Sequence, residues 1–533
     1  MCAKHVMQSK NGRLTATIEA NVPATLLQLL FDDDSLQTQR QNPSMEGVLC
    51  ATSIGGGYVT LAHKDRFMLL GHPEHTLSDY RLISVGNDAT SHDETVTALY
   101  CMDIYTSAHK KYLRRNQSEK QDSQSLCVMV GYSSGYVRVF SLYGHLLTAH
   151  QFHSQPLLRI RLRMPSQTNN SVRSAQKVHY NSGTVSQMNP APDDAEEVSL
   201  TYADGTIVNV DGRSLYLALR LCLTEATTDE TSEPTFQYKK WTFDLNTPSI
   251  SDAVSYGPAT CKDPLSSLAK NTMTSSPLLS DATAGFIVAP QSGEAAFGVF
   301  ITNEDAAAAF SAVDIAGKVA AKVTGAVLSI AKSYLWRNNP LTSSSGSNHN
   351  NGNTSQDSMG KQGSGTLVPC TMAICDSPRK VLHISLAPAQ YNLAALVDSL
   401  GRVMIFDIES CEVVHMLKGF RGCQCAWLEA EYHVENVNNS ALNNTRNMRK
   451  TFIVIYASKR GVLELYELGT MNQPYASISV GLGWTLVQCP SQPLGGSLII
   501  GNQGSERRAT SPGLADCILL DSSGRMAEIK VEI

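Results

Sequence analysis

The chain has 533 residues, of which 42% are hydrophobic and 17% charged, and its formal net charge is −5. This composition supports a sizeable core, and it lacks the basic excess of proteins that bind nucleic acid by electrostatics, so no nucleic-acid partner is expected. The thirteen cysteines are an odd number scattered between Cys2 and Cys517, which favours reduced thiols in a cytoplasmic protein over a disulfide framework.

Targeting and membrane-spanning signals are weak in this sequence. The first thirteen residues, MCAKHVMQSKNGR, have no apolar core of the kind that a signal peptide needs. The stretch that comes nearest to a membrane span, residues 306–336, is interrupted by Asp314, Lys318, Lys322 and Lys332. We therefore expect a soluble protein of the cytoplasm.

A pattern of apolar run, glycine turn and apolar run recurs along the chain. Its copies lie at residues 48–61, 126–152, 197–212, 285–302, 391–419, 452–468 and 517–533. Glycine supplies the positive φ of tight turns, so each copy predicts a hairpin. In the clearest copy, Val403, Met404, Ile405 and Phe406 follow one another without polar alternation, which indicates a sheet covered on both faces.

Antiparallel sheets stacked face to face around a ring are typical of β-propellers. The copies are spaced irregularly, beyond the roughly 40–45 residues of a WD repeat, but loops absorb such insertions at low entropic cost. No WD dipeptide closes any unit. We predict an all-β, irregular WD-like propeller of about seven blades over residues 47–533, preceded by a lead-in of residues 1–46.

Three segments interrupt the repeat. Residues 165–194 are polar and indicate a loop, and the Ser/Gly/Asn tract of residues 338–365 predicts disorder because it has little to bury. Between them, residues 304–337 are rich in alanine and carry an apolar stripe at helical spacing, which predicts one long amphipathic helix. A shorter helix is expected over residues 215–223.

Three roles are open for the helix of residues 304–337. It packs on the side of the propeller, docks onto a partner subunit, or lies on an anionic membrane surface through its apolar stripe and neighbouring lysines.

Candidate metal sites carry little signal. His72, Glu74 and His75 lie together in a turn-rich stretch, without the helical spacing or the further ligands of known metal sites. The pairs Cys423/Cys425 and Cys370/Cys375 lack the Cys-x-x-Cys spacing of zinc and redox sites. We expect a solvated loop, packed or free thiols, and no metal.

Signatures of catalysis are also missing. Gly55-Gly56-Gly57 precedes a strand and not a helix N-terminus, so it predicts a turn and not a phosphate cradle. No nucleophile elbow, Walker sequence or kinase signature occurs, and no cofactor is expected. A triad scattered over loops stays open, because triads are recognised by geometry.

Two segments combine cations with aromatic side chains. Their residues are Tyr238, Lys239, Lys240 and Trp241 in the first, and Lys418, Phe420 and Arg421, with Trp427 beyond, in the second. One interpretation is a strand edge whose tryptophan is buried between blades. The other is a partner-binding surface, where Trp, Tyr and Arg are the energetic anchors.

These segments also carry a family resemblance. Residues 131–138, 238–241, 401–403 with Asp407, 418–421 with Trp427, and 452–457 followed by 460–464 occur in this order. Together they resemble the N-terminal region of the non-catalytic, regulatory subunit of the Rab-three GTPase-activating complex. The resemblance covers roughly residues 94–468, and the Ala-rich segment ending at Leu335-Trp336 has a similar counterpart there.

The resemblance implies a subunit without chemistry of its own that pairs with a catalytic GTPase-activating chain. The complex stimulates GTP hydrolysis on Rab GTPases of vesicle traffic, and the family is also implicated in nucleotide exchange on Rab-eighteen, at the endoplasmic reticulum. The catalytic arginine is credited to the partner chain, which acts in trans. Family members continue past the propeller with a long helical region, so we expect that region to be missing from a chain that stops at Ile533.

Two other functions remain open from the sequence. One is an unrelated propeller scaffold for membrane tethering or protein assembly. The other is a propeller enzyme with its site in the central channel, which would need convergent acids or histidines at strand starts.

Overall fold

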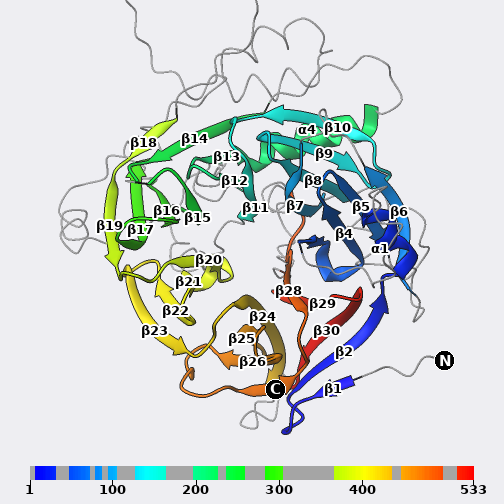
Figure 1. Ribbon diagram of the computed structural model, residues 1–533, viewed down its shortest axis with the longest axis vertical. Coiled ribbons are helices and arrows are strands. Elements are labelled where there is room, and N and C mark those ends of the chain that lie inside the picture. The colour runs from blue at the N-terminus through cyan, green and yellow to red at the C-terminus, as the bar shows by residue number, and fades with distance from the viewer. Residues whose placement is uncertain are drawn as a thin grey trace, which may run out of the picture.

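The computed structural model describes residues 6–31, 47–71, 79–86, 94–104, 126–163, 196–225, 236–245, 247–258, 283–303, 365–434, 446–495 and 513–533. These residues form seven sheets that stand around one axis, and Figure 1 looks down the ring. Neighbouring strands are antiparallel in every sheet, apart from one parallel pair in the third.

Blades 1 to 4 follow one another in chain order. Blade 1 holds β3 (Leu49–Thr52), β4 (Tyr58–His63), β5 (Arg66–Gly71) and β6 (Arg81–Gly86). Blade 2 holds β7 (Val96–Asp103), β8 (Leu126–Tyr132), β9 (Tyr136–Ser141) and β10 (Leu146–Gln151). Blade 3 holds β11 (Leu157–Arg163), β12 (Glu197–Tyr202), β13 (Ile207–Asp211), β14 (Tyr238–Phe243) and, parallel to β14, β18 (Thr366–Val368). Blade 4 holds β15 (Ile250–Pro258), β16 (Thr283–Pro290), β17 (Ala295–Asn303) and β19 (Cys370–Cys375).

Blades 5 to 7 complete the ring. Blade 5 holds β20 (Val381–Leu386), β21 (Leu393–Asp398), β22 (Arg402–Asp407) and β23 (Glu412–Lys418). Blade 6 holds β24 (Cys423–Val434), β25 (Arg446–Ala457), β26 (Val462–Glu467) and β27 (Ala476–Ser479). Blade 7 holds β28 (Trp484–Cys489), β29 (Asp516–Asp521), β30 (Arg525–Val531), β2 (Leu14–Asn21) and β1 (Val6–Gln8). The first strands of most successive blades contact one another around the axis, β24 of blade 6 mainly contacts the second strand of blade 5, β21, and β28 of blade 7 contacts β3 of blade 1.

Blade 7 is built from both ends of the described chain. β2 pairs with β30 from Leu14 opposite Val531 to Asn21 opposite Arg525, so hydrogen bonds between distant segments close the ring. The sequence prediction assigned residues 1–46 to a lead-in outside the propeller, whereas the structure places β1 and β2 inside it. β1 and β2 form a hairpin through a turn at Gly12, and the other partner of β2, β30, lies some 500 residues away in the sequence.

Stacking of the blades explains the apolar strands. Within β22, Val403 and Ile405 pack into the cluster shared with blade 6, and Met404 and Phe406 pack into the one shared with blade 4. All four side chains are at most 4% exposed. Successive side chains of a strand point to opposite faces, so a strand between two blades needs apolar residues at every position. The prediction of an all-β propeller is confirmed, with seven blades.

The two α-helices of the described residues lie outside the sheets. α1 (Ala24–Phe31) buries Leu27 and Leu30 against β4 and β5 of blade 1. α4 (Gly212–Glu225) follows β13 and confirms the short helix expected at residues 215–223. Gly55 and Gly56 lie in a 3₁₀ turn, η1 (Ile54–Gly56), between β3 and β4, as the turn interpretation predicts.

The long helix expected at residues 304–337 lies outside the described residues. So do the polar loop of residues 165–194 and all but the last residue of the loop predicted for residues 338–365. Among the residues that are described, no helix is long and apolar enough to cross a bilayer.

Candidate functional site

The first cation–aromatic segment lies in β14 and is largely internal. Trp241 is fully buried and its ring packs 5.4 Å from that of Phe286, in the cluster between blades 3 and 4. Lys240 is 6% exposed, and its Nζ lies 3.1 Å from His153 Nδ1. Burial lowers the pKa of Lys240. Tyr238 and Lys239 are half-buried. Trp241 is therefore buried between blades, as one of the two interpretations predicts, but β14 is not an edge strand, because it pairs with both β13 and β18.

The second segment is divided between core and surface. Trp427 is 1% exposed, and its indole Nε1 donates to the Ser385 carbonyl, 3.3 Å away in blade 5. Phe420 is 3% exposed, whereas Lys418 and Arg421 on either side of it are exposed. The tryptophan and phenylalanine thus join blades 5 and 6 and offer no surface to a partner. Of the predicted partner-binding residues in this segment, the two cations remain available for that role.

Arg421 lines a pocket of about 490 Å³ between the outer ends of blades 5 and 6. We call it the basic pocket; its lining residues are Leu400, Gly419, Arg421, Ala457, Lys459 and Arg460. Three of the six are cations, and each comes from a turn or corner at the same edge of the two blades. The sequence analysis singled out Arg421, but it used residue 460 only as part of a turn and in the family resemblance, and it did not consider residue 459. The signal in the sequence was the occurrence of two consecutive cations, Lys459 and Arg460, at a predicted hairpin turn.

Backbone hydrogen bonds hold the corner that carries Arg421 in place. The amides of Gly419 and Phe420 donate to the Gly401 carbonyl at 3.0 and 2.9 Å, which ties the corner to the blade 5 turn. On the other side, Ser458 Oγ donates to the Gly422 carbonyl at 2.6 Å, which ties it to the blade 6 turn.

Gly401 itself meets two requirements. Its φ is +94°, a conformation that side-chain-bearing residues rarely adopt, and a Cβ there would lie 2.7 Å from the Arg421 amide nitrogen. Glycine at this position is therefore what lets the corner approach the turn.

Phe420 and Glu464 hold the side chain of Arg460 in position. Its guanidinium lies 5.1 Å from the centre of the Phe420 ring and 3.2 Å from Glu464 Oε1. Tyr466 donates its hydroxyl to the other Glu464 oxygen at 2.8 Å. Burial and this carboxylate raise the pKa of Tyr466, so the hydroxyl keeps its proton at neutral pH. The predicted residue Phe420 thus contributes to the pocket by supporting Arg460.

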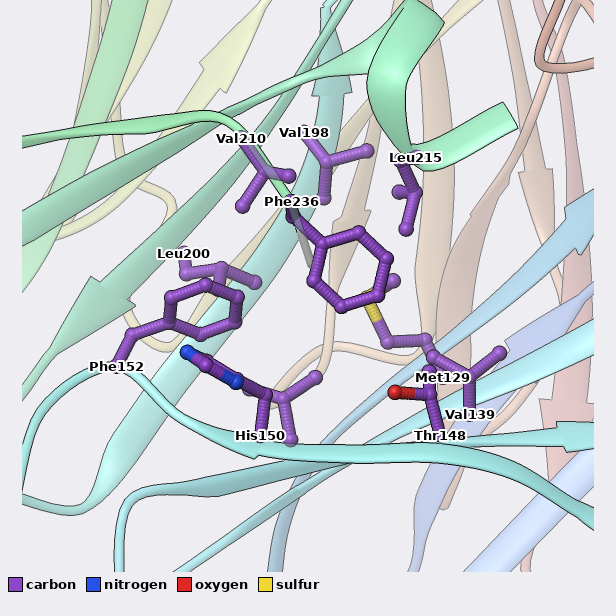
Figure 2. A pocket seen from close by; sticks show the side chains of 11 residues that line it. Met129, Val139, Thr148, His150, Phe152, Val198, Leu200, Val210, Leu215 and Phe236 are labelled. Atoms are coloured by element: carbon purple, nitrogen blue, oxygen red, sulfur yellow. The ribbon is translucent and has the colours of Figure 1, made fainter. Parts of the chain in front are cut away.

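A second cavity, between blades 2 and 3, has a different character. Figure 2 shows it lined by apolar side chains such as Met129, Leu200 and Phe236, with Thr148 and His150 as the polar residues of the lining. Its volume is about 20 Å³, which is room for about one water molecule. It is a packing gap in the core and is too small for a cofactor.

A buried charge network joins blades 3, 4 and 5. Asp252 on β15 is fully buried and accepts from Arg161 Nη2 at 2.8 Å and from the Ile384 amide at 2.9 Å, while His383 Nδ1 lies 3.1 Å away. We call Asp252, Arg161 and His383 the Asp252 node. Burial by itself would raise the pKa of Asp252, but Arg161 and His383 hold that pKa well below its usual value. Each charge in the Asp252 node is compensated by its neighbours. The node therefore joins the first strands of blades 3, 4 and 5.

The other candidate groups are free thiols and a histidine pair. Cys423 and Cys425 are buried free thiols on β24, and Cys370 and Cys375 are exposed free thiols on β19. Within the part of the chain that the structure describes, no three His, Cys, Asp or Glu side chains gather as metal ligands. The stretch that contains His72 and His75 lies outside it.

Several solved structures are similar to this chain at low identity. Sqt1 of Saccharomyces cerevisiae is 10% identical, with a TM-score of 0.38, and the match covers 99% of this chain and 95% of that one. The C-terminal WD40 domain of Sif2 is 8% identical, with a TM-score of 0.36 and coverages of 92% and 97%. A computationally designed protein, Ika8, is 8% identical, with a TM-score of 0.35 and coverages of 92% and 98%. At these TM-scores the likenesses add nothing to the fold assigned from the sheets.

A family match covers most of the propeller. Residues 45–487 match the family described as "Rab3 GTPase-activating protein regulatory subunit N-terminus". The matched span begins just before β3 and ends within β28, so it contains all of blades 1 to 6. It also contains both cation–aromatic segments and the basic pocket. The chain therefore belongs to the family of Rab3 GTPase-activating protein regulatory subunits, through their N-terminal region.

Proposed function

We propose that this chain is a non-catalytic scaffold subunit of a Rab GTPase-activating complex. Membership of the regulatory-subunit family over residues 45–487 is the observation that carries the proposal. The chain pairs with a catalytic subunit and supports GTP hydrolysis, or nucleotide exchange, on a Rab GTPase in vesicle traffic. It acts in the cytoplasm and peripherally at endoplasmic reticulum or vesicle membranes.

The mechanism we propose is positional. A closed ring of seven stacked blades changes shape little, because each blade is packed on both faces. Such a body holds two partners in a fixed relation, which lowers the entropic cost of bringing them together. The transition-state charge on the transferred phosphoryl group is stabilised by an arginine of the catalytic subunit, acting in trans. No arginine of this chain is assigned that role.

The basic pocket is the part of the described surface that best suits a partner contact. It joins two blades, carries three cations and is backed by a rigid corner. Arginine is enriched at the energetic centres of protein interfaces. The helix expected at residues 304–337 remains a second predicted contact, to a partner subunit or to an anionic membrane.

Co-expression with a candidate catalytic subunit tests the proposal. The expected result is that the two chains co-purify and that single-turnover GTP hydrolysis on a Rab GTPase is faster with both chains than with the catalytic subunit alone. A parallel assay follows release of labelled GDP, to separate hydrolysis from exchange. Absence of co-purification together with unchanged rates of hydrolysis and exchange would reject the proposal.

A further inference from the structure

Two of the three cations that line the basic pocket have no carboxylate partner. Within the described residues, Arg421 and Lys459, and Lys418 beside the pocket, have no carboxylate within salt-bridge distance, whereas the more buried Arg161, Arg163 and Arg402 are all paired. Only Arg460 of the pocket is already bound to a carboxylate, that of Glu464. We propose that the pocket binds a carboxylate-bearing segment of a partner protein, an inference that rests on the proposed role as a subunit of a complex.

The dimensions of the pocket fit side chains of a peptide. The pocket, of about 490 Å³, is open to solvent on one side, so it suits side chains of a segment that lies across it and not an enclosed small molecule. Its wall also contains Leu400, which is 42% exposed in the blade 5 turn. An acidic segment with an apolar residue beside its carboxylates would place the carboxylates on Arg421 and Lys459 and the apolar side chain on Leu400.

The chemistry of the cations fits carboxylates. A guanidinium presents a planar fork of N–H donors that matches a carboxylate in a bidentate pair, and an ammonium adds a point charge beside it. Arg421 supplies the fork and Lys459 the ammonium. Glu464 is already bound to Arg460, so the charge that is left for a ligand comes from Arg421 and Lys459.

The pocket exists before any partner binds. The Arg421 corner is fixed to the blade 5 turn through Gly401 and to the blade 6 turn through Ser458. Little backbone ordering is therefore left to oppose association, and preorganised donors bind more tightly than mobile ones.

The face of the propeller that carries the basic pocket mixes both signs of charge. The turns that join the second and third strands of the blades all lie on one face of the ring. The corresponding turns elsewhere carry Asp65 beside Lys64 in blade 1, Asp204 in blade 3 and Glu294 in blade 4, and Lys380 lies beside the blade 4 and blade 5 turns. An anionic membrane needs a broad basic surface, because each lysine or arginine near the lipid adds a small attraction. A local basic pocket on a face of mixed charge instead fits a peptide.

The test uses the full chain and a fluorescein-labelled peptide of six glutamates and one leucine, with a glutamine version as the neutral probe. Fluorescence anisotropy is measured at about 50 and about 300 mM salt, because screening weakens exposed charge pairs over this range. We expect the glutamate peptide to bind, the glutamine peptide to bind at least about tenfold more weakly, and binding to fall with salt.

Charge reversal localises the binding. The double variant Arg421→Glu, Lys459→Glu should weaken the glutamate peptide by about tenfold or more. The matched control Lys64→Glu, in the corresponding turn of blade 1, should bind as the unmodified chain does. Far-ultraviolet circular dichroism and the urea midpoint confirm that the double variant folds. The conservative variant Lys459→Arg should retain binding.

Three results would overturn the inference. The first is no saturable binding of the glutamate peptide, and the second is equal binding of that peptide by the double variant. The third is a higher affinity for phosphatidylserine vesicles, measured by flotation, than for the peptide. Co-purification with a catalytic subunit is read separately. A chain that co-purifies but ignores the glutamate peptide retains the proposed function and loses this inference. A chain that binds the peptide through Arg421 and Lys459 but does not co-purify retains the inference and loses the proposed function.

Discussion

The Asp252 node and the basic pocket are both charged, but their charges are arranged in opposite ways. In the node, Asp252 is fully buried, and Arg161 donates to it from the first strand of the preceding blade. In the pocket, Arg421 and Lys459 lie on turns and have no carboxylate partner among the described residues. A buried charge must be compensated, and an exposed one need not be. The charges of the Asp252 node therefore stabilise the fold, whereas those of the basic pocket are available to bind a partner.

The largest effect is expected at the node. Asp252→Ala removes the acceptor for Arg161 and for the Ile384 amide, and leaves the guanidinium without its carboxylate. We expect a loss of about 3–5 kcal/mol in the free energy of unfolding, as for other broken buried ion pairs. Urea unfolding measured by circular dichroism gives the value.

Glu294→Ala, on the exposed turn of the same blade, is the matched control and should change stability by less than about 0.5 kcal/mol. Equal effects of the two substitutions would remove the distinction between node and surface.

The node should also set the response to acid. Its neighbours lower the pKa of Asp252 in the folded state, so the unfolded chain takes up the proton first. The stability that this carboxylate contributes is fully present above the unfolded value of about 3.9, and it is lost progressively as the pH falls from that value through the lower pKa of the folded state. Between about pH 5 and pH 2, the urea midpoint of the unmodified chain should therefore fall more steeply than that of Asp252→Asn. Parallel slopes would show that Asp252 is not the group responsible.

Two turns of nearly the same sequence extend the comparison to smaller effects. Asp398 and Asp521 each open a turn that ends in an arginine four residues later, at Arg402 and Arg525. Arg402 is 12% exposed and also binds Asp376, whereas Arg525 is 51% exposed. Burial alone would raise the pKa of Asp398, but hydrogen bonds from Arg402 hold that pKa below its usual value.

We expect Asp398→Ala to cost about 1–3 kcal/mol, because donors that are partly buried lose their acceptor. Asp521→Ala should cost less, because water replaces the carboxylate at the more exposed Arg525. Differential scanning calorimetry of both variants provides the test. A larger loss of stability for Asp521→Ala than for Asp398→Ala would contradict the argument that the more exposed pair contributes less.

The sequence predicted the repeated architecture because that information is local. Runs such as residues 403–406 are apolar at every position, and the structure buries them alternately on two neighbouring blades. The sequence also singled out Trp241 and Phe420, but cation–aromatic alternation by itself does not distinguish core from surface. Trp241 on β14 is covered by blade 4, in the cluster that also holds Phe286, whereas Arg421 follows the end of β23 at the surface.

Non-local features could not be predicted in the same way. The partners of Asp252 lie 91 residues before it and 132 residues after it, and neither pair has a sequence signature. The basic pocket requires two turns, around residues 400 and 459, to meet in space. That meeting follows from stacking of successive blades, which fixes neighbours only after the ring has been assembled.

The smallest effect is expected in the pocket. The double variant Arg421→Ala, Lys459→Ala removes two exposed cations that have no carboxylate partner among the described residues. We expect the free energy of unfolding to change by less than about 0.5 kcal/mol, because exposed side chains without structural contacts contribute little to folding. Urea unfolding of this double variant and of Asp252→Ala, side by side, measures the smallest and the largest expected change in stability in one experiment. A loss of more than about 1 kcal/mol in the pocket variant would mean that these cations serve the fold. Their lack of partners would then no longer indicate a surface kept for binding.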